Sequence, residues 1–310
     1  MSINAAIFPG QGAQLVGMGK DVAARYQVAA DTFTQADEIL GLGLSTLCFE
    51  GPAERLSATD IQQPAIFTTS VAIFRAALDS EVFTTDQFTA MGGLSLGEYT
   101  ALHLAGALSF EDALKLVHRR GRLMQEACDS NPGGMASLMG MDEDKVLALC
   151  ERVAPVGRVG PSNFNCPGQI VISGDKAACE AAAKFVEDFD GKAIPLDVAG
   201  AFHSELMRSA AEGLKPALEA CELRQPNPRV VANVDAEYHD RPAAIRDRLY
   251  QQVVSPVRWQ ACVERLVADS CDTFWEVGPN RVLAGLMRKI NRKVKTINVS
   301  SADRLSAAKE

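Results

Sequence analysis

The chain has 310 residues, of which 47% are hydrophobic and 23% are charged, and this composition is typical of a globular protein. Its formal net charge of −8 argues against general nucleic-acid binding, which requires a basic surface, and no apolar run is long enough to span a bilayer. We therefore expect one large α/β domain, or a core with a smaller inserted domain, that binds neither nucleic acid nor membrane.

The first 130 residues alternate short apolar runs with helical patterns. Ser109 and Asp112 are spaced as in a capping box, which predicts the start of a helix. In chain order, strands are expected at 4–8 and 88–91, and helices at 21–40, 64–78, 98–105 and 110–127.

Residues 131–198 have a different rhythm. Strands are expected at 135–139, 159–164, 169–172 and 193–198, and helices at 143–153 and 176–189, the second capped by Asp175. The order βαββαβ is that of a ferredoxin-like unit. We therefore predict an inserted ferredoxin-like subdomain at 131–198, within a core formed by 1–130 and 199–310.

The remaining residues return to alternating helices and strands. Helices are expected at 205–221, 244–253 and 260–268, and strands at 229–233, 273–277 and 296–299. A further helix is expected after the turn at 278–280, ending at about residue 289. Such alternation predicts a mainly parallel sheet with helices on both faces, whose ligands bind beyond the carboxyl ends of the strands. The loop at 9–14, the turn around Ser95 and the turn at Gly278 all follow strands, so we expect them at one rim.

The most informative segment is Gly93-Leu94-Ser95-Leu96-Gly97, which lies between a predicted strand and a predicted helix. The pattern GxSxG in that context indicates a nucleophile elbow, because the glycines permit the crowded turn. Ser95 would lie at a helix N-terminus, where free N–H groups favour developing negative charge. The segment therefore predicts a serine nucleophile for acyl transfer, although a glycine-rich turn with an incidental serine also fits the pattern alone.

A serine nucleophile needs a neighbouring base, and the chain has only four histidines. His103 lies on the helix after Ser95 and points away from the turn, His118 lies within the next helix, and His239 lies in a polar turn. His203 occupies a loop of small residues between a strand and a helix, where catalytic residues are common. By elimination His203 is the best candidate, with a capping or packing role as the alternative.

Other classes of site are not indicated. The glycine-rich segment at 9–20 contains neither a P-loop nor a dinucleotide-binding pattern, and no spacing of His and Cys suggests zinc. Eight scattered cysteines without a CxxC pair favour reduced thiols, and the N-terminus lacks the basic residues of a signal peptide. We therefore expect a cytoplasmic enzyme without a metal or nucleotide cofactor.

Six motifs taken together resemble the malonyl-CoA:acyl carrier protein transacylases, over nearly the whole chain. They are PGQGAQ at 9–14, GLSLGEY at 93–99, RGRLMQ at 120–125, NFNCPGQ at 163–169, GAFHS at 200–204 and EVGP at 276–279. The resemblance implies a hydrolase-like core with a ferredoxin-like insert, as the element order also predicts.

The resemblance also implies roles for individual residues. Ser95 corresponds to the nucleophile and His203 to its base. The family orients this histidine through a backbone carbonyl rather than an acidic residue, and Gln252 occupies the matching position. The backbone N–H groups of Gln11 and Leu96 would form the oxyanion hole, where each preorganised donor is typically worth about 3 kcal/mol.

Further residues are assigned to the substrate by the same resemblance. Arg120 matches the arginine that binds the malonyl carboxylate, for which its planar fork is suited. Phe202 would disfavour branched acyl groups, because its ring occupies the volume that an α-methyl group needs. Asn165, within the motif at 163–169, is expected to contact substrate. Leu94 stands where many members have histidine, which removes a polar contact beside the pocket.

The resemblance implies transfer of a malonyl group from malonyl-CoA to the phosphopantetheine thiol of acyl carrier protein, for fatty-acid biosynthesis. The expected route is ping-pong, through a malonyl ester of Ser95, with malonyl-CoA as a substrate and no cofactor. We expect a monomer. The alternatives are a polyketide-type transacylase acting in trans, a serine thioesterase or hydrolase with Asp197 as a triad acid, and a non-catalytic scaffold that binds the carrier.

One local exception to the acidic composition lies near the C-terminus, where five cations fall within eight residues. A solvated helix end explains such a run, since cations are favoured there. The alternative is a docking patch for an acidic carrier protein. The residues are Arg288, Lys289, Arg292, Lys293 and Lys295.

Overall fold

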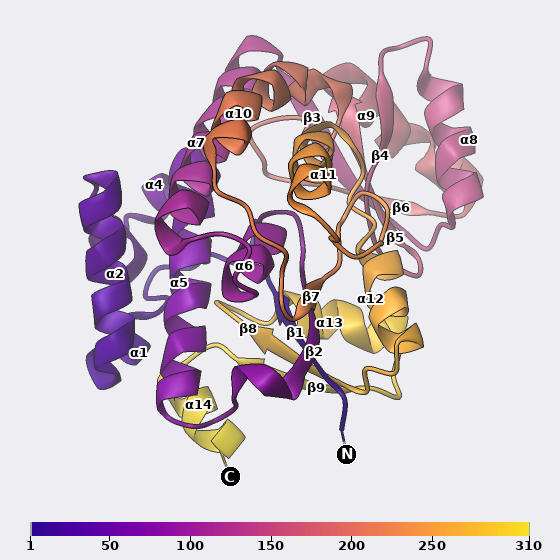
Figure 1. The fold of residues 1–310 in the computed structure, drawn as a ribbon. Helices are drawn as coiled ribbons and strands as arrows, with labels where there is room; N and C mark the ends of the chain where they lie inside the picture. Colours follow the sequence, from indigo (N-terminus) through magenta and orange to yellow (C-terminus); the bar gives the residue numbers. More distant parts are fainter. Residues whose placement is uncertain (1, 310) are drawn as a thin grey trace.

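The computed structural model describes residues 2–309. A five-stranded parallel sheet, in the order β7-β2-β1-β8-β9, forms the centre of the larger lobe (Figure 1). Its strands are β1 (Asn4–Phe8), β2 (Phe88–Gly93), β7 (Arg229–Val230), β8 (Thr273–Val277) and β9 (Lys295–Val299).

Helices cover both faces of this sheet, as strand alternation requires. Ala6 and Phe8 of β1 pack into the larger hydrophobic core, whereas Ala5 and Ile7 pack into a second core with residues of α12 and α13. The helices of this lobe are α1 (Lys20–Arg25), α2 (Gln27–Leu40), α3 (Leu44–Glu50), α4 (Ala53–Ser57), α5 (Thr59–Asp79), η1 (Thr85–Gln87), α6 (Leu96–Leu104), α7 (Phe110–Ser130), η3 (Glu205–Met207), α10 (Arg208–Ala220), α11 (Pro242–Val254), α12 (Trp259–Ala268), α13 (Val282–Ile290) and α14 (Ala302–Lys309).

The smaller lobe lies at the upper right of Figure 1 and contains an antiparallel sheet of four strands in the order β4-β5-β3-β6. Its elements follow in the order β3 (Gly133–Met139), α8 (Glu143–Val153), β4 (Val159–Cys166), β5 (Gln169–Asp175), α9 (Lys176–Phe185), η2 (Val186–Phe189) and β6 (Lys192–Pro195). Residues of both helices pack with the strands in a separate hydrophobic core. This βαββαβ arrangement confirms the predicted ferredoxin-like pattern.

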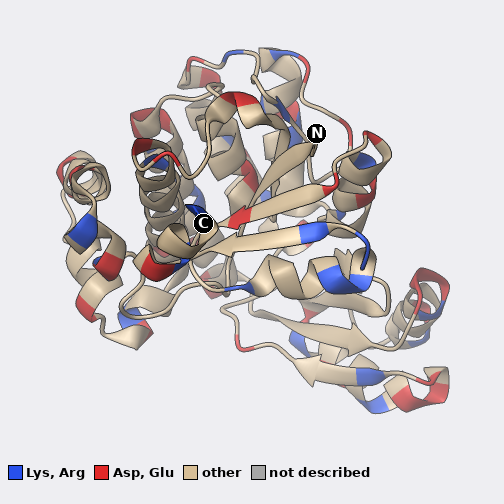
Figure 2. Ribbon diagram, turned by 90° about the horizontal axis from the view of Figure 1, so that it is seen from below, with Lys and Arg blue, Asp and Glu red and all other residues tan. Residues whose placement is uncertain are grey.

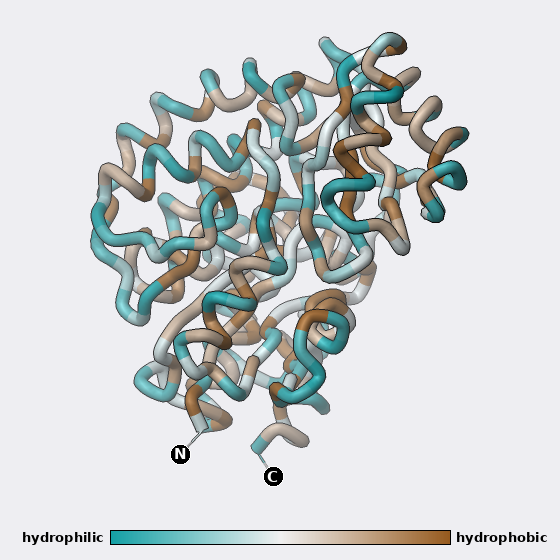
Figure 3. Tube along the Cα trace, turned by 90° about the vertical axis from the view of Figure 1, so that its right-hand side faces the viewer, coloured by the Kyte–Doolittle hydropathy of each residue, from teal (hydrophilic) through white to brown (hydrophobic). Residues whose placement is uncertain are grey.

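Hydrophobic and hydrophilic stretches alternate along the outer helices, as expected of amphipathic helices that cover a core (Figure 3). Ser109 caps α7, since its side chain accepts a hydrogen bond from the Asp112 amide at 3.0 Å. Among the described residues, no helix combines the length and the apolarity that a bilayer crossing requires.

Several predicted boundaries are wrong. The helix expected at 21–40 is interrupted at Tyr26, whose backbone is extended, and the helix expected from 64 begins at Thr59 with Pro64 inside it. A proline favours the first turn, which explains the misplaced start. The strand expected at 229–233 has only two residues. The short helices α3, α4 and α14 were not predicted.

Three further predictions, all for the smaller lobe, are wrong. The helix expected at 176–189 ends at Phe185 and continues as the 3₁₀ helix η2, and the strand expected at 193–198 ends at Pro195. Asp175 precedes α9 but makes no side-chain cap. Its carboxylate instead accepts a hydrogen bond at 2.8 Å from the backbone N–H of Arg158, the residue before β4, so a contact from a neighbouring segment takes the place of the local one.

Candidate active site

The turn between β2 and α6 has the geometry of a nucleophile elbow. Ser95 has a positive φ of 53° with ψ of −102°, a strained conformation for a residue other than glycine. A Cβ atom at Gly93 would lie 2.0 Å from the Gly97 carbonyl oxygen, and one at Gly97 would lie 2.2 Å from the Phe8 oxygen. Both positions therefore require glycine, because backbone occupies the space of a side chain.

His203 lies beside the serine, 108 residues away along the chain. Its Nε2 is 2.8 Å from Ser95 Oγ, and its Nδ1 is 2.7 Å from the backbone oxygen of Gln252. Because a carbonyl oxygen can only accept, Nδ1 carries the proton and Nε2 is left to accept one from the serine. The structure thus brings together Ser95, His203 and the carbonyl of Gln252 as the resemblance implied.

The imidazole is buried, and this sets its charge. Desolvation, reinforced by the positive charge of Arg120, lowers the pKa of His203 to about 3. The hydrogen bond from Nδ1 to Gln252 opposes this change but does not cancel it. At neutral pH the ring is therefore unprotonated, which is the form that a general base needs.

Arg120 on α7 reaches the same hydroxyl. Its guanidinium donates to Ser95 Oγ at 2.9 Å, to Gln252 Oε1 at 3.0 Å and to Gln63 Oε1 at 2.7 Å. The side chain is buried, and burial lowers the pKa of Arg120. Each of its hydrogen-bond partners in the described chain is an uncharged oxygen. The buried carboxylate of Glu98 lies near enough to oppose this lowering of the pKa, but it forms no hydrogen bond with the guanidinium. A cation without a directly bonded carboxylate thus lies beside the nucleophile, so the site is suited to an anionic ligand.

The loop after β1 lies against the elbow. A Cβ atom at Gly10 would lie 2.2 Å from the Leu94 carbonyl oxygen, so the two backbones are in close contact. Leu96 is the first residue of α6, where an amide has no partner within the helix. Within residues 2–309, the amides of Gln11 and Leu96 donate no hydrogen bond that would occupy them. These are the two N–H groups expected to receive an oxyanion.

A buried polar network beneath the elbow was missed by sequence reasoning. Asn233, which follows β7, accepts from the Ser95 amide at 2.6 Å, and Glu98 on α6 accepts from the Asn233 amide at 3.0 Å. His239 Nε2 is 2.8 Å from the other oxygen of Glu98. His239 lies in the polar segment before α11, as predicted, but its side chain is buried. The one available signal was a charged residue within the otherwise apolar start of α6.

Gln63 is a second residue that sequence reasoning missed. It is fully buried within the apolar helix α5, and its oxygen accepts from Arg120. A glutamine at zero exposure among apolar neighbours indicates a specific partner, because an unpaired amide would be costly to bury. The partner lies 57 residues away, so the sequence could suggest its existence but not its identity.

The remaining predicted residues form no side-chain hydrogen bond with Ser95, His203 or Arg120 in the described chain. Phe202 is buried next to the base. Asn165 lies at an irregularity of β4, and within the part of the chain described it forms no hydrogen bond with Ser95, His203 or Arg120. Asp197 is exposed, and the ring nitrogen that a triad acid would need is bonded to Gln252, which contradicts its role as a triad acid.

His103 points away from the elbow as predicted. Its Nδ1 is 3.0 Å from the Leu108 carbonyl oxygen, and its ring packs against Phe67 and Phe110.

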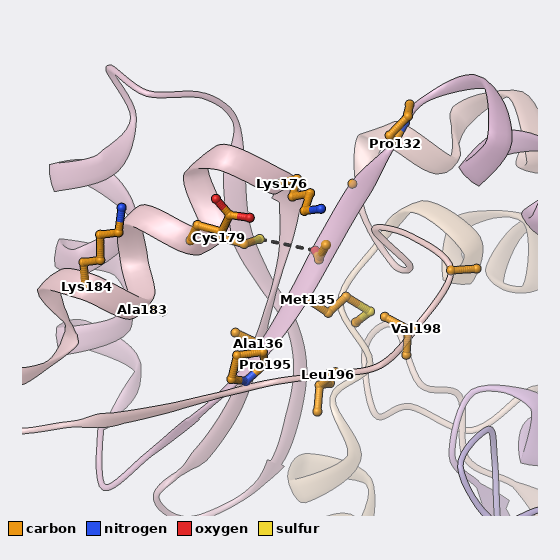
Figure 4. A pocket seen from close by; sticks show the side chains of 14 residues that line it. Pro132, Met135, Ala136, Lys176, Cys179, Ala183, Lys184, Pro195, Leu196 and Val198 are labelled. Atoms are coloured by element: carbon orange, nitrogen blue, oxygen red, sulfur yellow. Dashed lines mark hydrogen bonds between the residues drawn. The ribbon is translucent and has the colours of Figure 1, made fainter.

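Cavities flank the smaller lobe, and two of them bear on the site. One of about 310 Å³ is lined by His203 and Ser204 of the larger lobe and by Pro161 and Ser173 of the smaller one, so it reaches the base. The other, of about 720 Å³, lies between β3, α9 and the chain after β6 and is shown in Figure 4. Neither Ser95 nor His203 lines that larger cavity. The first cavity is therefore the one that adjoins the base, although Ser95 does not line it.

The five C-terminal cations form an exposed basic patch. They lie at the end of α13, in the following turn and at the start of β9, where Figure 2 shows a cluster of blue segments. The basic patch comprises Arg288, Lys289, Arg292, Lys293 and Lys295.

Comparison with known proteins gives consistent relatives. The acyl transferase domain model matches residues 6–305. A malonyl CoA-acyl carrier protein transacylase of Bacillus subtilis (strain 168) is 44% identical over 310 residues, covering 99% of this chain and 96% of the relative.

Solved structures agree. An acyl-carrier-protein-S-malonyltransferase from Bartonella henselae has a TM-score of 0.95 at 38% identity, with 99% of this chain and 98% of that one covered. A type II PKS acyl-carrier protein in complex with its malonyl-transacylase contains a chain with a TM-score of 0.95 at 39% identity, with 99% of each chain covered.

Proposed function

This chain belongs to the acyl transferase family of the malonyl CoA-acyl carrier protein transacylases, and we propose on that basis that it transfers malonyl groups from malonyl-CoA to acyl carrier protein. The observation that carries the proposal is that a base and a buried cation both contact the hydroxyl of Ser95. Ser95 Oγ lies 2.8 Å from an unprotonated imidazole nitrogen and 2.9 Å from a buried guanidinium. The first neighbour activates the oxygen, and the second binds a substrate with a negative charge close to its reacting carbon.

The first half-reaction loads the serine. Nε2 of His203 accepts the hydroxyl proton while Oγ of Ser95 attacks the thioester carbonyl of malonyl-CoA. The N–H groups of Gln11 and Leu96 bind the oxyanion that develops, and the C–S bond then breaks. The imidazolium returns its proton to the sulfur of coenzyme A. A malonyl ester of Ser95 remains.

The second half-reaction transfers the malonyl group from Ser95 to the carrier. His203 accepts the proton of the phosphopantetheine thiol, the sulfur attacks the ester carbonyl, and the same N–H groups bind the second oxyanion. Breaking the C–O bond regenerates Ser95, which recovers its proton from the imidazolium. The proposed transfer uses side-chain and backbone groups alone, with malonyl-CoA as a substrate rather than a cofactor.

Arg120 is proposed to hold the malonyl carboxylate through both steps. Its Nη2 donates to Ser95 Oγ already, so the tail of an acyl group on Oγ would lie within reach. The carboxylate would replace an uncharged oxygen as the acceptor, and charge-assisted bonds are stronger than neutral ones. The same step offsets the unfavourable burial of an unpaired cation.

Phe202 and Asn165 are proposed to contact the acyl group, Phe202 because it is buried next to the base and Asn165 on the family match alone. We also propose that residues 131–198 act as a subdomain that borders the site. In support, β4 is joined to the larger lobe by hydrogen bonds between Phe164 and Val257 at 2.9 Å and between Val257 and Ser162 at 2.9 Å.

The setting proposed for the enzyme is fatty-acid biosynthesis in the cytoplasm. All eight cysteines are buried free thiols, which suits a reducing compartment. The carrier could also be that of a polyketide pathway, since the structural relative in complex with a carrier has a type II PKS partner. Transfer rates to the two purified carriers distinguish these cases.

The test of the proposed function is the covalent intermediate. Wild-type enzyme incubated with malonyl-CoA alone should gain the mass of one malonyl group, on the peptide that contains Ser95. Ser95→Ala should gain none, whereas the control Ser306→Ala, altered on the distant helix α14, should label normally. Stoichiometric labelling of Ser95→Ala would overturn the proposal.

A further inference from the structure

Glu98 is a buried carboxylate that the proposed chemistry does not use. It is fully buried on α6, three residues after the nucleophile, among apolar neighbours. Burying an ionised group is unfavourable unless its oxygens are fully hydrogen-bonded, and an apolar residue would fill the space without that cost. The contacts of this side chain should therefore show what it does.

Glu98 departs from the usual local arrangement at a helix start. A glutamate at the third helical position normally reaches back to the amide of the N-cap residue, here Ser95. In this protein that amide donates instead to Asn233 Oδ1 at 2.6 Å, and Asn233 Nδ2 donates to the Gly93 carbonyl at 2.8 Å. One amide side chain thus spans the strained turn and binds its backbone on both sides of Leu94.

Glu98 in turn holds the residue that spans the turn. Its Oε2 accepts from the backbone N–H of Asn233 at 3.0 Å and also from the side-chain Nε2 of Gln252 at 2.7 Å. The same Nε2 donates to the Ser95 carbonyl at 3.0 Å. The orientation of the Gln252 amide is unambiguous, because its oxygen accepts from Arg120. A single carboxylate oxygen therefore joins the segment that holds the nucleophile to the residue that orients the base.

His239 completes the arrangement from the other side. Its Nε2 is 2.8 Å from Glu98 Oε1, and this is the only side-chain hydrogen bond of the ring within residues 2–309. Both oxygens of the buried carboxylate thus have partners. His239 lies 141 residues from Glu98 along the chain, so the contact is a product of the tertiary fold.

We propose that Glu98, held by His239, is a positioning residue that sets the nucleophile and its base at their mutual distance. It acts on Ser95 through Asn233 and on His203 through Gln252, and it touches neither substrate nor the reacting atoms. This role rests on the proposed function of Ser95 and His203. Displacement of a reacting group by about 1 Å can cost about 10²-fold in rate, so loss of the shared anchor should be seen in the chemical step.

The first comparison is Glu98→Ala against Glu98→Gln. The amide oxygen of glutamine can still accept from the backbone N–H of Asn233 and from Gln252 Nε2. Alanine leaves the Asn233 N–H without an acceptor and leaves Gln252 Nε2 with the Ser95 carbonyl alone. Active sites are counted with a fluorophosphonate probe that reacts with Ser95, and the rate of malonyl-enzyme formation is measured per active site. We expect Glu98→Ala to lose about 10²-fold in that rate with an unchanged site count, and Glu98→Gln to lose less than about 10-fold. A normal rate per site in Glu98→Ala, with any loss confined to the number of sites, would overturn the proposal.

The second comparison applies even where Glu98→Ala does not fold. The amide nitrogen of glutamine reaches about as far as Nε2 of histidine, whereas that of asparagine matches Nδ1. Since only Nε2 of His239 contacts Glu98, His239→Gln should keep most of the rate and His239→Asn should lose about 10-fold. Equal rates per site in the two variants would contradict the inference.

The probe also separates this inference from the proposed function. If wild-type enzyme reacts with the fluorophosphonate but never forms the malonyl ester, the proposed function fails. The rate of phosphonylation in the same variants then still measures whether Glu98 positions the nucleophile.

Discussion

Replacement of Arg120 by methionine tests the origin of malonyl selectivity. Methionine fills an elongated buried space without a charge, so the change removes the cation and its hydrogen bonds. The guanidinium contacts Ser95 Oγ at 2.9 Å, and a malonyl carboxylate hydrogen-bonded to it would lie about 4 Å from the charge. Acetyl-CoA carries the same reacting carbonyl without the carboxylate and provides the matched comparison.

The magnitude follows from the geometry. Opposite unit charges about 4 Å apart attract by about 4 kcal/mol at an effective dielectric constant of about 20. Desolvation of the carboxylate offsets part of this, so about 3–4 kcal/mol remains, or about 10²–10³-fold in rate. We expect kcat/KM for malonyl-CoA to fall by that factor in Arg120→Met while kcat/KM for acetyl-CoA changes little. Arg120→Lys should be intermediate, since one ammonium cannot replace the planar fork.

Stability should respond differently from activity. Removing Arg120 relieves the burial of an unpaired cation but leaves the oxygens of Gln63 and Gln252 without a donor, at about 1–3 kcal/mol each. These terms oppose each other, so the free energy of unfolding in urea should change by less than about 2 kcal/mol. Rapid-quench assays with labelled malonyl-CoA and acetyl-CoA measure the selectivity. An unchanged ratio of the two substrates in a folded Arg120→Met enzyme would refute the reasoning.

Three further outcomes are expected. Because burial and Arg120 lower the pKa of His203 to about 3, the base stays unprotonated and kcat/KM for malonyl-CoA should be flat between about pH 5 and 8. An acidic limb centred near the ordinary histidine pKa would contradict this. Phe202→Ala should raise the rate with methylmalonyl-CoA relative to malonyl-CoA by about 10–100-fold in competition assays, and an unaltered ratio would remove its role. Reversing the charges of Arg288 and Lys289 in the basic patch should raise KM for the carrier but not for malonyl-CoA, with a smaller effect at high salt. Equal changes in both KM values would exclude carrier docking there.

Much of this site could be predicted from short segments of sequence. The glycines around Ser95 indicate a strained turn because only they allow backbone to approach so closely, and the alternation of strand and helix patterns indicates the parallel sheet. His203 was found by elimination among four histidines. Each of these signals is local: periodicity and turn chemistry act over a few residues and therefore leave a trace in the order of amino acids.

The partners beneath the elbow were decided by the tertiary structure alone. Asn233 lies 138 residues from Ser95, and nothing in its own neighbourhood shows that the two meet. Gln252 was expected to orient His203, but the hydrogen bond from its side chain to the Ser95 carbonyl, across 157 residues, was not. The buried contact of His239 with Glu98 was missed for the same reason. A buried polar group is stable only when a matching donor or acceptor reaches it, and that match depends on how distant elements pack. The amino-acid sequence therefore indicates which groups are reactive, whereas the packing of the fold determines which groups hold them in place.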